Sequence, residues 1–181
     1  PGRQPVTTLL RNASAHDKVM AFLNRELEKG RQAYIVYPII EESDKLALKA
    51  AKANLTLIVE PLNNRVNHKG FFLTNCRDGL KLMKETDNPH VKLLFDIYHE
   101  QVQVGDVTRT VIDAISYTAV FHIADNPGRN DPGTGEINYP NIYKAIQKAG
   151  YASYICMEYL PLGEPVASLK KSVDAMRANL V

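Results

Sequence analysis

Six short apolar runs, each followed by a stretch with helical periodicity, constrain the fold of this 181-residue chain more than any other feature. Most of the runs are rich in β-branched or aromatic residues and apolar almost without interruption, which is typical of parallel strands buried on both faces. They cover residues 6–10, 32–39, 55–60, 91–96, 119–125 and 154–159. Helix signals lie between them, among them Asn75 as an N-cap and Pro140 and Pro165 at first helical positions. The sequence therefore predicts an α/β fold of six consecutive βα units with a mainly parallel sheet.

The composition argues against two classes of partner. The net charge is +2, from 22 basic and 20 acidic side chains, and no basic run marks a nucleic-acid surface. No apolar stretch approaches the ~20 residues of a membrane span, and no signal peptide is recognised. Cys76 and Cys156 form neither a CxxC motif nor a disulfide framework, which favours a reducing compartment. We therefore expect a cytoplasmic protein with no nucleic-acid and no membrane partner.

Four of the apolar runs carry a side chain of metal-binding type at or near their ends. These side chains are Glu60, Asp96, His122 and Glu158. Taken singly, such a carboxylate is more often a helix cap or part of a surface ion pair, and such a histidine is more often a hydrogen-bonded core residue. In parallel βα folds, however, the carboxyl ends of the strands meet at one edge, where sites are built. Three carboxylates and one imidazole suit Mn²⁺, Mg²⁺ or Co²⁺ better than a thiolate-binding metal.

The second part of the chain resembles the hydroxypyruvate isomerase family, which belongs to the xylose-isomerase-like TIM barrels. The matching segments are residues 58–65, 95–99, 122–129, 132–139 and 157–159. The resemblance covers the last four βα units of an eight-unit barrel. His122 is typical of the ketose epimerases among these barrels, whereas close hydroxypyruvate isomerases often carry glutamine at that position.

The resemblance also implies roles for individual residues. One divalent ion is held in such barrels by the residues that match Glu60, Asp96, His122 and Glu158. The residues matching Glu60 and Glu158 also act as acid and base, and they move a proton between adjacent carbons of a small hydroxy-carbonyl substrate through an enediolate. His99 and Arg129 match positions that hold substrate oxygens.

The first part of the chain resembles the second motor domain of RecG-type DNA helicases, where two βα units form part of a RecA-like (Rossmann-type) sheet. The matching segments are residues 5–8, 30–43 and 45–51. No GxxxxGK[ST] phosphate loop occurs in the sequence, so we expect no nucleotide cofactor and no helicase activity. The two resemblances meet near residues 51–54. They predict a single hybrid domain over 1–181, with a helicase-like fragment at 1–53 and an isomerase half-barrel at 54–181.

Fragments of two domains joined in or just after a helix favour an engineered or recombined chimera without evolved activity, because natural fusions usually join whole domains. On this first hypothesis the protein is not an enzyme. Two alternatives stay open: a metal-binding module without turnover, and a working aldose–ketose or hydroxypyruvate isomerase or ketose epimerase. An open sheet is favoured over a closed barrel. A further alternative is a homodimer in which both chains contribute strands to one sheet. Glu60 and Glu158 reach one ion only if the sheet keeps the curvature of a barrel.

Overall fold

The computed structural model describes residues 15–29, 52 and 55–180. The chain divides into two compact units, residues 1–35 and 36–181. The described part of the first unit is helix α1 (His16–Glu28), and the second unit contains the sheet and the remaining helices. The strands predicted at 6–10 and 32–39 lie outside the described residues, as does the junction predicted near 51–54 apart from Lys52.

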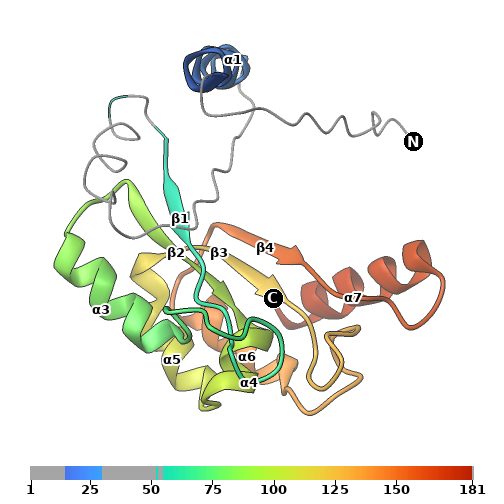
Figure 1. The fold of residues 1–181 in the computed structure, drawn as a ribbon. Coiled ribbons are helices and arrows are strands. Elements are labelled where there is room, and N and C mark those ends of the chain that lie inside the picture. Colours follow the sequence, from blue (N-terminus) through green and yellow to red (C-terminus); the bar gives the residue numbers. More distant parts are fainter. Residues whose placement is uncertain (1–14, 30–51, 53–54, 181) are drawn as a thin grey trace. The chain divides into compact units, whose positions relative to one another are not determined.

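A parallel sheet forms the centre of the second unit (Figure 1). Its four strands lie side by side in chain order: β1 (Leu57–Val59), β2 (Val91–Asp96), β3 (Thr118–Ile123) and β4 (Tyr154–Met157). Each neighbouring pair is parallel. Within the described residues the sheet is open, with β1 and β4 at its two edges. The predicted fold class, a parallel α/β fold with an open sheet, is confirmed for these four strands.

Helices follow the strands and cover the sheet. They are α3 (Cys76–Thr86), α4 (Ile97–Gln103), α5 (Val107–Ala114), α6 (Tyr139–Lys148) and α7 (Pro165–Asn179), and a short 3-10 turn, η2 (Ile115–Tyr117), follows α5. Figure 1 shows α3, α5 and α6 in one layer on the same side of the sheet. The predicted helix starts are confirmed to within one residue: Asn75 caps α3, Pro165 begins α7 and Pro140 is the second residue of α6.

One helix departs from the sequence prediction. None of the sequence signals marks a helix directly after β2, but α4 begins there without a break. Its first turn is capped by Asp96, which accepts a hydrogen bond from the backbone N–H of His99 at 3.1 Å. Seven residues give less than two full turns, too few for an apolar periodicity to show in the sequence. The helix places His99 beside the end of β2.

The register of the strands determines which side chains meet at the carboxyl edge. Asp96 of β2 pairs with His122 of β3, and Ile123 pairs with Met157, so that Glu158 follows directly after β4. Behind this edge the aromatic rings of Phe95 and Phe121 are fully buried, with centroids 5.4 Å apart. A close-packed core of this kind fixes the strands beneath the site.

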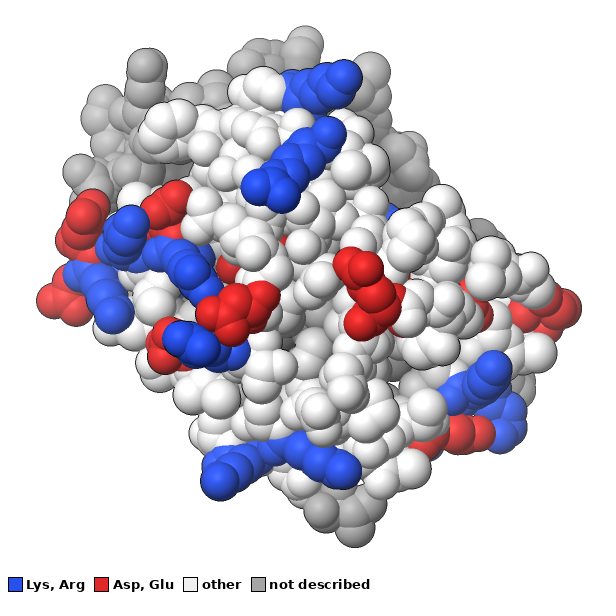
Figure 2. Space-filling view, turned by 90° about the horizontal axis from the view of Figure 1, so that it is seen from below, with Lys and Arg blue, Asp and Glu red and all other residues white. Residues whose placement is uncertain are grey.

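The surface is mixed in charge. On the face seen in Figure 2, acidic and basic side chains are interspersed and much of the area between them is uncharged, in keeping with the net charge of +2. Among the described residues, no helix combines the length and apolarity that a membrane crossing requires.

Candidate metal and substrate site

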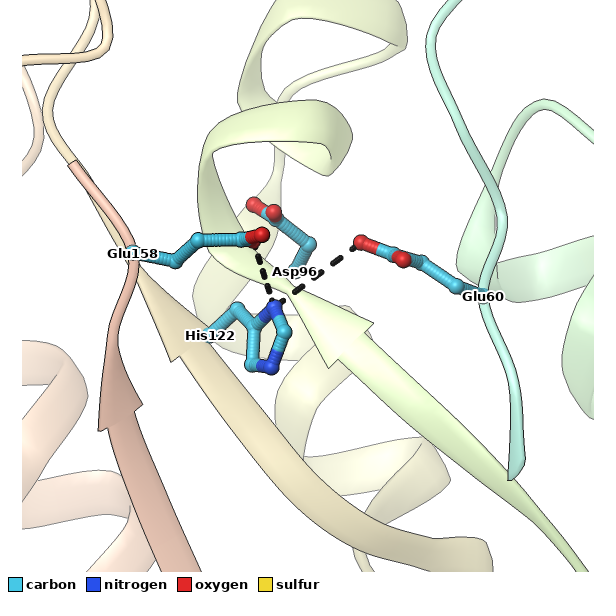
Figure 3. Close-up of side chains that lie close together, drawn as sticks. All are labelled: Glu60, Asp96, His122 and Glu158. Atoms are coloured by element: carbon cyan, nitrogen blue, oxygen red, sulfur yellow. Dashed lines mark hydrogen bonds and ion pairs between the residues drawn. The ribbon is translucent and has the colours of Figure 1, made fainter. Parts of the chain in front are cut away.

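Four side chains from four successive strands converge at the carboxyl edge of the sheet (Figure 3). Each of them offers one ligand atom, and these atoms all lie within 4.8 Å of one another. The residues are those singled out in the sequence: Glu60, Asp96, His122 and Glu158. An open sheet therefore still brings Glu60 and Glu158 together, because four twisted parallel strands keep enough curvature to aim their ends at one point.

Glu60 is the least satisfied member of the cluster. Its Oε1 atom is buried and has no hydrogen-bond partner among the described residues. The atom lies 3.9 Å from Nδ1 of His122, which is beyond hydrogen-bond distance. Burial, with the negative charge of Asp96 as a second cause, raises the pKa of Glu60 to about 7. The folded chain thus contains a buried carboxylate oxygen that makes no hydrogen bond within the described residues, although the His122 ring lies near it.

Asp96 is 1% exposed and lies at the bottom of the site. One carboxylate oxygen caps α4, and the other accepts a hydrogen bond from Nη2 of Arg129 at 3.0 Å. Burial raises the pKa of Asp96 to about 6, because the cost of removing the carboxylate from water outweighs the attraction of Arg129. Asp96 therefore ends β2, caps α4 and pairs with the positive charge of Arg129.

His122 and Glu158 form a close pair. Nδ1 of His122 lies 2.6 Å from Oε2 of Glu158. Burial lowers the pKa of His122, but its hydrogen bond to Glu158 and the charge of that carboxylate outweigh burial and raise the pKa overall. The same hydrogen bond lowers the pKa of Glu158 to about 2. Glu158 is thus a stable carboxylate over the whole neutral range.

The donor set fits a divalent cation. Three carboxylates and one imidazole are crowded together, and the buried Oε1 of Glu60 lacks a partner that a cation would supply. Oxygen-rich ligands with a single imidazole suit Mg²⁺, Mn²⁺ or Co²⁺. A bound cation would lower the repulsion between the carboxylates and compensate the buried charge.

Arg129 lies at the same edge and makes several contacts with the cluster. Its Nη2 atom donates hydrogen bonds to Asp96 at 3.0 Å and to Glu158 at 2.7 Å. The guanidinium also lies over the ring of Tyr98, 5.3 Å from the centroid. Arg129 has a backbone φ of 57°, a left-handed conformation that is uncommon outside glycine and that concentrates at functional sites. The predicted substrate contact thus stands beside the predicted metal ligands.

His99 is 1% exposed and has Arg129 on one side and Asn63 on the other. Burial, with the positive charge of Arg129 as a second cause, lowers the pKa of His99 to about 3, so the ring is neutral. The sequence prediction did not include Asn63, whose side chain is fully buried between His99 and the loop that follows β1. The signals for it in the sequence are its position three residues after Glu60 and its place in the matching segment 58–65.

Comparison with known proteins gives a consistent result. The sequence model of a family described as a xylose isomerase-like TIM barrel matches residues 22–179. Hydroxypyruvate isomerase of Escherichia coli K12 is 35% identical over 132 residues, which cover 73% of this chain and 51% of that protein. The 2-oxo-tetronate isomerase of Cupriavidus necator is 35% identical over 120 residues, which cover 66% of this chain and 46% of that protein. The chain spans about half the length of these curated relatives.

A solved structure supports the fold. The crystal structure of an AP endonuclease, family 2, from Brucella melitensis is similar with a TM-score of 0.74 and 28% sequence identity. The match covers 89% of this chain and 67% of that one.

These findings correct the hypothesis of a chimera without evolved activity. One family model covers residues 22–179, and so crosses the predicted junction near 51–54 and includes much of the segment assigned to a helicase. The curated relatives are named isomerases. No comparison supports the helicase part of the predicted hybrid, and from residue 22 onward the segment falls within the barrel family. An apolar strand followed by an amphipathic helix has the same local pattern in a RecA-like sheet and in a TIM barrel.

Proposed function

This chain belongs to the xylose isomerase-like TIM barrel family, and on that premise we propose that it carries the metal site of a metal-dependent isomerase of small hydroxy-carbonyl compounds. The names of the two isomerases that are 35% identical to it support this class of substrate. Within the proposal, Glu60, Asp96, His122 and Glu158 hold one divalent ion.

The convergence of these four residues is the observation that carries the proposal. Their ligand atoms lie within 4.8 Å of one another although they come from four different strands. Three carboxylates share this point with one guanidinium and one imidazole, so the cations of the chain offset only part of the negative charge when all three are ionised. The unpartnered, buried oxygen of Glu60 argues in the same direction.

The two glutamates supply the acid–base chemistry. A divalent ion in this position would polarise a substrate carbonyl and make the neighbouring C–H bond more acidic. Glu60 and Glu158 both lie at this point of the site, and carboxylates act as general acids and bases in such proton transfers. We assign to Glu60 and Glu158 the transfer of one proton from a carbon to its neighbour. A second proton passes from the substrate hydroxyl to the former carbonyl oxygen, so the carbonyl and hydroxyl groups exchange places and the isomer forms with no net gain or loss of atoms or electrons.

His99 and Arg129 orient the substrate in this scheme. The guanidinium of Arg129 reaches Asp96 and Glu158, so a substrate oxygen next to it lies close to the proposed acid–base groups. The Nε2 atom of His99 lies 3.1 Å from Nη1 of the same guanidinium. Both residues place donors where an oxygen-rich substrate needs them.

Turnover of the compounds named in the relatives tests the proposal. With Mn²⁺, the chain should isomerise hydroxypyruvate or 2-oxo-tetronate, and Glu60→Gln should reduce the rate by about 100-fold or more, as expected for the loss of an acid–base group. Glu85→Gln removes an exposed carboxylate from α3 and serves as the matched control. A wild-type chain that converts neither compound with Mn²⁺, Mg²⁺ or Co²⁺ would contradict the proposal, as would full activity in Glu60→Gln.

A further inference from the structure

Asn63 occupies a fully buried position in the loop between β1 and α3, where each polar atom of its side chain has a partner. Oδ1 accepts hydrogen bonds from the backbone N–H groups of Val66 at 3.1 Å and Asn67 at 3.2 Å. Nδ2 lies 3.0 Å from Oδ1 of Asn67 and 2.5 Å from Nδ1 of His99. The amide is therefore held on both sides.

The orientation of this amide follows from the backbone. A backbone N–H is a donor that cannot reverse its role, and two of them point at the same side-chain atom of Asn63, so that atom must be the oxygen. The NH₂ group consequently faces His99. The backbone N–H of Asn63 also points at Nδ1 of His99, at 3.4 Å.

Two donors directed at Nδ1 determine the tautomer of His99. In a neutral imidazole one nitrogen accepts and the other carries the hydrogen. Because Nδ1 must accept from Asn63, the hydrogen resides on Nε2. The reverse tautomer would direct an N–H at the NH₂ group of Asn63, only 2.5 Å away.

The consequence appears on the other side of the ring. Nε2 of His99 lies 3.1 Å from Nη1 of Arg129, and both atoms carry hydrogens, so neither can accept from the other. Oδ2 of Asp96 is 3.7 Å from Nε2, beyond hydrogen-bond distance. Within the part of the chain that the structure describes, the Nε2–H of this buried histidine thus has no acceptor at hydrogen-bond distance, and the Nη1 donor of Arg129 lies beside it.

We propose that Asn63 is a positioning residue that fixes His99 as the Nε2–H tautomer, so that His99 and Arg129 present two donors to one oxygen of the substrate. The substrate part of this inference rests on the proposed function, whereas the tautomer follows from contacts within the chain. A site with two adjacent donors binds a carbonyl or carboxylate oxygen of a ligand, and it discriminates against compounds that lack such an oxygen.

Nitrogen NMR of the ring tests the tautomer directly. Long-range ¹H–¹⁵N correlation spectra of protein labelled on its five histidines distinguish a protonated ring nitrogen from an unprotonated one, and the His99→Gln variant identifies the His99 signals. We expect Nε2 of His99 to be protonated and Nδ1 to be the acceptor. A hydrogen on Nδ1 in the wild-type protein would overturn the proposal without the use of any Asn63 variant.

Asn63→Asp extends the test to the role of Asn63. The carboxylate can still accept from the two backbone N–H groups, but its second oxygen accepts from Nδ1–H, so the His99 tautomer should reverse. Asn64→Asp adds the same charge one residue along, at an exposed position that has no contact with His99, and should leave the tautomer unchanged. An unchanged tautomer in Asn63→Asp would refute the assignment.

Kinetics connect the tautomer with substrate binding. Loss of one donor to a substrate oxygen should raise KM by about 10- to 100-fold in Asn63→Asp with a much smaller change in kcat, because the contact is made before and during the reaction. Asn64→Asp should keep the wild-type KM, and an equal rise in both variants would overturn the substrate part. Absence of turnover in the wild-type protein would count against the proposed function alone, since the NMR result does not depend on it.

Discussion

At the scale of single residues, the site combines carboxylates with opposite behaviour. Glu60 and Asp96 are buried, and burial raises the pKa values of both above their ordinary range. Glu158 has two cationic neighbours, and its hydrogen bond to His122 lowers its pKa to about 2. Environment thus separates chemically similar groups in the ion-free protein: the pKa of one carboxyl is lowered and the pKa values of two are raised.

The stability of the metal-free protein should fall as the pH rises through the neutral range. A group whose folded pKa exceeds its unfolded value stabilises the fold below the unfolded pKa and loses that contribution as the pH passes the folded pKa. Glu60 and Asp96, with folded pKa values of about 7 and 6 against ordinary values of 4.5 and 3.8, both have this sign. For Glu60 the loss between about pH 5 and 8 amounts to roughly 3 kcal/mol at most.

Urea unfolding in EDTA at several pH values measures this loss. Glu60→Gln should show a flatter dependence of the free energy of unfolding on pH than the wild-type protein, because glutamine does not titrate. Glu85→Gln, on the exposed side of α3, should follow the wild-type curve. Parallel curves for Glu60→Gln and the wild-type protein would show that Glu60 has an ordinary pKa.

At the scale of helices and strands, the candidate site lies at the junctions that follow the strands. Asp96 ends β2, caps α4 and faces the metal site, so a single residue joins all three. The start of α3 is held by Asn75, and also by Glu100 of α4, whose Oε2 accepts a hydrogen bond from the backbone N–H of Cys76 at 2.7 Å. The contacts of Asn75 and Glu100 hold the start of α3 and do not involve the four proposed ligands.

Removal of the α3 cap should cost stability but leave metal binding intact. Oδ1 of Asn75 accepts a hydrogen bond from the backbone N–H of Asp78 at 2.9 Å. Asn75→Ala should lower the free energy of unfolding by about 1 kcal/mol, whereas Asn75→Ser keeps an acceptor and should recover most of it. Urea titrations of the three proteins measure the difference. Equal losses in the alanine and serine variants would show that the side-chain hydrogen bond contributes nothing.

At the scale of the whole molecule, ion binding and folding are coupled. Four ligands from four strands come together only in the folded sheet, so an ion that binds them stabilises the native state over the unfolded chain. The stabilisation at 100 times the dissociation constant is about 2.7 kcal/mol. For a protein of this size, 1 kcal/mol raises the melting temperature by about 2–4 °C.

Mn²⁺ should therefore raise the melting temperature by about 5–10 °C, and EDTA should reverse the effect. Asp96→Asn should abolish the response yet keep the cap of α4, since asparagine is also a good N-cap. Asp106→Asn removes a carboxylate that pairs with Arg77 and Arg109 outside the site, and it should respond like the wild-type protein. A melting temperature that does not respond to Mn²⁺ in the wild-type protein would contradict the metal site.

The sequence by itself determined the local elements and the chemistry available to them. Apolar runs predicted β1 to β4, and the two inner strands, β2 and β3, are largely buried as such runs indicate, whereas β1 and β4 at the edges are more exposed. Asn75 and Pro165 marked helix starts through effects that act within one turn. The four ligand-type residues could also be recognised from the sequence, because each of them stands at or near the end of an apolar run.

Only the tertiary structure decided how those residues act. The contacts between Asn63 and His99, and between His122 and Glu158, each join positions 36 residues apart, so no local pattern contains them. The raised pKa of Glu60 comes from burial first, and burial exists only once the strands and loops have packed. Helix α4 has seven residues, which carry little periodicity, so no sequence signal marked it. The helicase resemblance found no support in the comparisons, because βα units look alike across folds. Short-range rules therefore determined the elements and the ligand types, whereas convergence, charge state and tautomer depend on long-range packing.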